Sequence, residues 1–99
     1  MQDLEINARL TIPASELHWL FCRSSGAGGQ NVNKVESAVR LSWSVQESAC
    51  LGPFHRQRLL ERHRARLVNG CLVVSVSEER SQYQNRQIAL QRLAALIRE

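Results

Sequence analysis

The order of hydrophobic periodicities along this 99-residue chain constrains its fold more than any other feature. In the first half, apolar residues alternate with polar ones, which predicts half-buried strands, and helical spacing follows later. Four strands and two helices are expected, at 4–12, 18–23, 39–45 and 71–76 for the strands and at 54–67 and 82–98 for the helices. Because residues 71–76 are nearly all apolar, we expect this strand to be central. The order β-β-β-α-β-α predicts an α+β fold, with a small mixed four-stranded sheet and helices packed on one face.

Turn and capping residues mark the ends of the predicted helices. Gly52-Pro53 precedes the first helix, and Asn69-Gly70 supplies its C-terminal stop. Ser81 followed by Gln84 resembles a capping box that opens the second helix. We find no repeat and no linker, so residues 1–99 are expected to form a single domain.

Composition excludes several classes of protein. Hydrophobic residues make up 43% and charged residues 22%, as in folded soluble proteins. No apolar run approaches the roughly 20 residues that cross a bilayer, and the acidic start is unlike a signal peptide, so we expect no membrane association. Three widely spaced cysteines suit a reducing compartment, and we expect a cytoplasmic protein. No close Cys or His pair has metal-ligand spacing, so we expect neither a metal nor a cofactor.

The segment from 24 to 34 has no apolar period and contains three of the five glycines. A strand connection usually needs far fewer residues, so the segment is either slack or brings its backbone close to a ligand. The phosphate-binding P-loop pattern fails because Lys34 is followed by valine and a strand. The dinucleotide-binding pattern fails because Asn31 takes the place of its third glycine.

The stretch from Arg23 to Lys34 reads Arg-Ser-Ser-Gly-Ala-Gly-Gly-Gln-Asn-Val-Asn-Lys and continues to Val39-Arg-Leu41. It resembles the extended Gly-Gly-Gln (GGQ) signature of class I peptide-chain release factors. Residues 80–86, Arg-Ser-Gln-Tyr-Gln-Asn-Arg, resemble the second signature of that family. The resemblance spans nearly the whole chain, and the chain's size is most similar to the short ribosome-rescue branch, the release-factor-type peptidyl-tRNA hydrolases.

The resemblance implies ribosome-dependent hydrolysis of the peptidyl-tRNA ester, with Gly28, Gly29 and Gln30 as catalytic residues in a long mobile loop. Glycines permit a close approach that a Cβ would obstruct. The family implies that the main-chain N–H of Gln30 contacts the developing charge or the leaving oxygen, while its side-chain amide helps to position water. It also implies N-methylation of Gln30, with a glutamine methyltransferase as a partner.

Several basic and amide side chains are candidates for contacts with RNA. Arg23, Asn31, Asn33 and Lys34 flank the glycines and are expected to contact ribosomal RNA or the end of the tRNA. Arg58, Arg62 and Arg66 share one face of the first predicted helix, where they bind phosphates or form a solvated face. Trp19 and Trp43 are expected to pack in the core rather than stack on bases. We expect Gln82, Asn85 and Arg86 either to set the start of the second helix or to brace neighbouring structure.

The expected partners are the ribosome, at its peptidyl-transferase centre and rRNA, and peptidyl-tRNA. The chain has no length for a domain that reads stop codons, so we expect release from stalled ribosomes without codon recognition, by a monomer. The rescue branch continues into a Lys/Arg-rich tail; here we expect that the tail was removed, the alternative being that the protein has dispensed with it. Two other functions stay open: a non-catalytic ribosome- or RNA-binding module, and an autonomous hydrolase of free peptidyl-tRNA.

Overall fold

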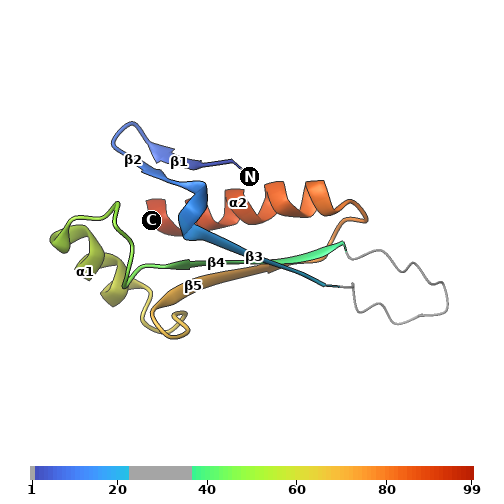
Figure 1. Cartoon of the computed structure of the whole chain (residues 1–99). Coiled ribbons are helices and arrows are strands. Elements are labelled where there is room, and N and C mark those ends of the chain that lie inside the picture. The colour runs from blue at the N-terminus through green and yellow to red at the C-terminus, as the bar shows by residue number, and fades with distance from the viewer. Residues whose placement is uncertain (1, 23–36) are drawn as a thin grey trace.

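The computed structural model describes residues 2–22 and 37–99. These residues confirm the α+β class (Figure 1). In chain order, the described elements are β1 (Leu4–Asn7), β2 (Leu10–Ile12), a 3-10 turn (Ala14–Glu16), β3 (Leu17–Cys22), β4 (Ala38–Ser44), α1 (Pro53–Arg62), β5 (Cys71–Val76) and α2 (Gln82–Arg98).

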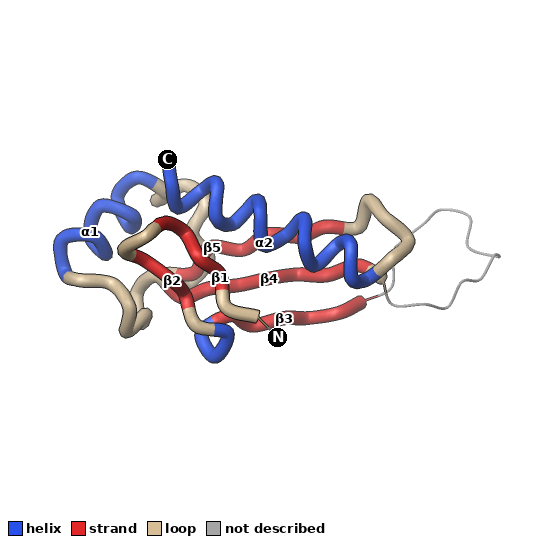
Figure 2. The backbone as a smooth tube through the Cα atoms, turned by 90° about the horizontal axis from the view of Figure 1, so that it is seen from above, coloured by secondary structure: helices blue, strands red, loops and turns tan. Residues whose placement is uncertain are grey.

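The larger sheet is antiparallel and has the order β3-β4-β5. Its middle strand alternates as the sequence predicts: Val39, Leu41 and Trp43 are fully buried, whereas Arg40 is exposed. The buried side chains lie on one face of the sheet, because successive residues of a strand point to opposite faces. Helix α2 lies along this face, with the β1–β2 hairpin beside it (Figure 2).

The prediction of one mixed four-stranded sheet is wrong, because the described strands form two separate antiparallel sheets. Residues 4–12 are a hairpin rather than one strand. The Asn7 side chain causes the turn: its Oδ1 accepts hydrogen bonds from the main-chain N–H groups of Arg9 and Leu10, at 2.8 and 3.0 Å. The central strand of the larger sheet is β4, so the prediction that residues 71–76 are central is also wrong.

Helix α2 confirms the predicted boundaries and links the two sheets. Ser81 caps it, accepting a 3.1 Å hydrogen bond from the N–H of Gln84. The helix buries Leu93 completely, against the sheet side of the core. At its other end, Arg98 Nε donates to the carbonyl of Ile6 at 2.7 Å. This bond fixes the end of α2 to strand β1.

Helix α1 ends five residues earlier than predicted, at Arg62 rather than Leu67. His63 is the C-cap residue, and its buried ring places Nε2 3.0 Å from the carbonyl oxygen of Leu96 on α2. Asn69 and Gly70 are not the stop of this helix. Both have positive φ, 54° and 80°, and form a two-residue turn that leads into β5, as Asn-Gly does in tight hairpins.

Candidate functional site

The candidate site begins where the β3–β4 hairpin leaves the sheet. The two strands pair from Leu17↔Trp43 to Cys22↔Ala38. The Cys22 end of the hairpin lies at the end of the sheet away from α1 (Figure 1). Residues 23–36 connect these strands and lie outside the described residues. The predictions for Arg23, Gly28, Gly29, Gln30, Asn31, Asn33 and Lys34 fall within this connection and stay predictions.

Asn85, from the second signature, braces the base of this hairpin. Its side chain is fully buried, and its Nδ2 donates to the carbonyl oxygens of Ser37 at 2.8 Å and of Glu79 at 2.9 Å. Its Oδ1 accepts from the N–H of Glu79 at 2.9 Å. Ser37 directly precedes β4, so the asparagine joins α2 to the residue at which the connection returns to the sheet. The predicted bracing role of Asn85 is confirmed.

Aromatic residues gather near the same end of the sheet. Trp19 and Phe21 of β3 stack with their ring centroids 6.1 Å apart, and the guanidinium carbon of Arg86 lies 5.7 Å from the centroid of the Tyr83 ring. Trp19, Tyr83 and Arg86 together line a hollow of about 60 Å³. Core packing is confirmed for both tryptophans: Trp43 is fully buried, and Trp19 is half-buried, packs against the core and also lines this hollow. Sequence reasoning missed Tyr83, although it lies within the second signature.

The other end of β3 is held by the carboxylate of Glu16. Trp43 Nε1 donates to Glu16 Oε1 at 3.0 Å, and the N–H of Ala49 donates to Oε2 at 3.0 Å. Ser48 Oγ donates to Oε1 as well. Burial raises the pKa of Glu16, but the hydrogen bonds from Ser48, Trp43 and Ala49 together outweigh it, so the pKa lies below its ordinary value. The network fixes the strand whose far end carries the predicted catalytic connection.

The predicted arginine stripe is only partly present. Arg58 and Arg62 are exposed on α1, four residues apart on one face. Arg66 lies beyond the end of the helix, so the prediction of three arginines on one helical face is wrong. The cause is the early helix end at His63, where the N–H of Arg66 bonds to the His63 carbonyl at 2.7 Å.

Arg56 belongs to the same basic segment but has a structural role. Its Nε donates to the carbonyl of Val45, and its Nη2 donates to the carbonyls of Ser48 and Leu51. These bonds tie the start of α1 to the loop that follows β4. A guanidinium that is occupied in this way is not available to a phosphate.

Within residues 2–22 and 37–99, no helix is long and apolar enough to span a membrane. The same residues contain no group of three or more His, Cys, Asp or Glu side chains arranged to hold a metal ion.

A GGQ connection that joins the paired strands β3 and β4 and is braced by an asparagine from a capped helix defines a catalytic domain of the peptide-chain release factor class. Comparison with known proteins agrees: residues 4–99 match the RF-1 domain family, and the chain belongs to this family.

Three relatives show how the match is distributed. Peptidyl-tRNA hydrolase ArfB of Pseudomonas putida is 42% identical over 95 residues, covering 95% of this chain and 69% of that protein. Large ribosomal subunit protein mL62 of Mus musculus is 34% identical over 89 residues, covering 89% of this chain and 43% of the relative. Peptide chain release factor 1 of Parabacteroides distasonis is 37% identical over 95 residues, covering 96% and 20%. The chain thus spans about two thirds of the first relative and less than half of the other two.

Proposed function

We propose that this protein is a ribosome-dependent peptidyl-tRNA hydrolase that releases nascent chains from stalled ribosomes without reading a codon. The observation that carries the proposal is the Gly28-Gly29-Gln30 sequence in the connection between two firmly paired strands, β3 and β4. The similarity to peptidyl-tRNA hydrolase ArfB over 95% of the chain supports the same activity.

The reaction is hydrolysis of an ester. Water attacks the carbonyl carbon, an oxyanion forms, and the bond to the ribose 3′-oxygen breaks as that oxygen takes up a proton. We assign the main-chain N–H of Gln30 to the developing negative charge or the leaving oxygen, and its side-chain amide to the attacking water. Glycines at 28 and 29 let the backbone come close to the ester. A preorganised donor of this kind is typically worth about 10²–10³ in rate.

The ribosome completes the site in this proposal. The peptidyl-transferase centre surrounds the ester, and Arg23, Asn31, Asn33 and Lys34 contact rRNA or the CCA end of the tRNA. The hydrogen bonds of Asn85 and Glu16 support this proposal, because they fix the two ends of the β3–β4 hairpin, whose strands the GGQ connection joins. The protein acts as a monomer in the cytoplasm, and a glutamine methyltransferase modifies the side chain of Gln30.

The test compares two substrates. Release of labelled peptide is measured on ribosome complexes stalled on an mRNA without a stop codon, and on free peptidyl-tRNA. Both substrates are tested with this 99-residue chain and with the same chain carrying a Lys/Arg-rich C-terminal extension. We expect release from the ribosome complexes and none from free peptidyl-tRNA. Release in solution would instead identify an autonomous hydrolase, and ribosome binding without release in any arm would identify a non-catalytic binding module.

A further inference from the structure

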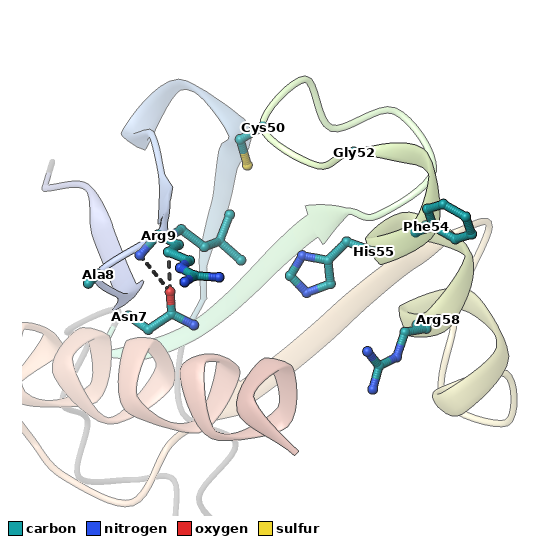
Figure 3. A pocket seen from close by; sticks show the side chains of 9 residues that line it. Asn7, Ala8, Arg9, Cys50, Gly52, Phe54, His55 and Arg58 are labelled. Atoms are coloured by element: carbon teal, nitrogen blue, oxygen red, sulfur yellow. Dashed lines mark hydrogen bonds between the residues drawn. The ribbon is translucent and has the colours of Figure 1, made fainter.

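A hollow of about 720 Å³ lies between the β1–β2 turn and the start of α1 (Figure 3), at the end of the molecule opposite the Cys22–Ala38 end of the β3–β4 hairpin. Arg9 stands on the hairpin wall, and His55 and Arg58 stand on the helix wall, with His55 pointing toward the hairpin. A smaller hollow of about 220 Å³ also contains His55 and Arg58, and continues to Arg62 and the end of α2. The two hollows share Asn7, His55 and Arg58, and Glu99 is the one acidic residue among those that line them; we call them together the basic groove.

The arginines of this groove differ in whether their guanidinium groups are occupied. Arg98 donates to the carbonyls of Ile6 and Glu5, and Arg62 donates to the carbonyl of Glu99. Within the described part of the chain, neither guanidinium of Arg9 and Arg58 has a hydrogen-bond or ion-pair partner, and no carboxylate is among the residues that line the larger hollow. Two unoccupied guanidinium groups on facing walls match the chemistry of a phosphate.

Phe54 is also among the residues that line the hollow, and its ring lies on the side of α1 away from the hairpin (Figure 3). The Phe54 side chain is 86% exposed on the first turn of α1. A single exposed aromatic is ordinary on a protein surface. Phe54 and Arg58 are four residues apart on α1 and so share one face of the helix. An exposed ring beside an unoccupied arginine is a combination found where proteins bind unpaired nucleotides, because every base has a π-face that stacks on an aromatic side chain.

We propose that this groove binds a single-stranded segment of RNA, with a phosphate between Arg9 and Arg58 and a base stacked on Phe54. His55 adds a ring N–H to the helix wall. This inference rests on the proposed function, because it gives the ribosome-bound protein a second RNA contact at the end away from the ester. An acidic peptide would suit the arginines but has no base to stack on Phe54.

The test measures binding of a fluorescent octauridylate by anisotropy at several salt concentrations. For Arg9→Ala and Arg58→Ala we expect weaker binding, with the slope of log K against log salt reduced by about 0.7 for each phosphate contact that is lost. For Phe54→Ala we expect a loss of about five- to a hundredfold with an unchanged slope, and for Phe54→Tyr retained affinity. The matched control is Arg64→Ala, which removes the same charge from an exposed position outside the hollow and should bind within about twofold of the unchanged chain.

Two results overturn the inference: Arg9→Ala and Phe54→Ala binding as well as Arg64→Ala, or polyglutamate displacing the RNA while Phe54→Ala has no effect. Peptide release is measured in parallel with the same variants. We expect Arg9→Ala, Arg58→Ala and Phe54→Ala, but not Arg64→Ala, to need more protein for half-maximal release while reaching the same maximal rate. Failure of the unchanged chain to release peptide would contradict the proposed function, and the oligonucleotide result would still decide whether the groove binds RNA.

Discussion

The side-chain amide of Asn85 donates a 2.8 Å hydrogen bond to the main-chain carbonyl of Ser37, 48 residues earlier in the chain. The same amide group holds both backbone groups of Glu79. One buried side chain therefore connects the start of α2, the segment that follows β5, and the residue at which the GGQ connection rejoins the sheet. This is the described contact through which the second signature supports the first.

Asn85→Ala should lower the free energy of unfolding by about 2–4 kcal/mol, because buried backbone groups of Ser37 and Glu79 lose their partners. Urea unfolding measures this loss. The matched control is Gln84→Ala, one residue earlier on the exposed side of α2, which should change stability by less than about 0.5 kcal/mol. Equal stability of the two variants would contradict the bracing role.

We expect the protein to lose part of its stability in acid when the carboxylate of Glu16 is protonated. Although burial raises its pKa, the hydrogen bonds it accepts lower the folded-state pKa below the unfolded value of about 4.3. The stabilisation is therefore complete above about pH 4.3 and is lost as the pH falls through the lower folded pKa. Glu16→Gln should be less stable at pH 7 and should lose less of its stability between pH 5 and pH 3. Urea unfolding of both proteins across this range measures the difference, and parallel pH curves would show that Glu16 contributes nothing to it.

Substitution of Arg56 and of Arg58, two arginines of helix α1, is expected to change stability to different extents. Arg56→Ala should destabilise the protein by about 2–3 kcal/mol, because the carbonyls of the loop after β4 lose a charged donor. Arg58→Ala should change stability by less than about 0.5 kcal/mol, since its side chain is exposed. Thermal unfolding compares them, and similar losses in both variants would contradict the assignment of separate roles.

Gly70 and Gly52 form a second matched pair. At Gly70, φ is +80° and an added Cβ would lie 2.9 Å from the Cβ of Gln46, whereas at Gly52 it would meet no atom within 4 Å. Gly70→Ala should therefore cost about 1–2 kcal/mol or more. Gly52→Ala should change stability by less than about 0.5 kcal/mol. If urea unfolding gives the two variants the same stability, the turn before β5 does not have the conformation described.

The sequence predicts the α+β class, the strands of the larger sheet and the whole of α2, because burial on one face leaves a regular pattern in the residues. The errors arise where a side chain acts on a distant or non-periodic partner. The alternation of residues 4–12 continues through a turn, because the Asn7 carboxamide closes a hairpin that returns the apolar side chains to the same face. The spacing of Leu59, His63 and Leu67 suits a longer helix, but α1 ends at Arg62, and the side chain of the C-cap residue His63 contacts α2 instead.

The candidate site was predictable to a similar extent. The bracing role of Asn85 follows from the second signature and is confirmed, whereas the GGQ segment lies outside the described residues and stays a prediction. The groove formed by Arg9, His55 and Arg58 could not be predicted, because no periodicity relates a turn near the N-terminus to the first turns of α1. Only tertiary structure brings these residues to facing walls.

The most direct test of the account is the rate of peptide release by Gly29→Ala on stalled ribosome complexes, at a protein concentration that saturates binding. We predict a loss of at least about 100-fold, with unchanged ribosome binding and unchanged stability, because a Cβ at this position keeps the main chain from the ester. Release within a few-fold of the unchanged chain would contradict the central claim that the glycine backbone carries the catalysis.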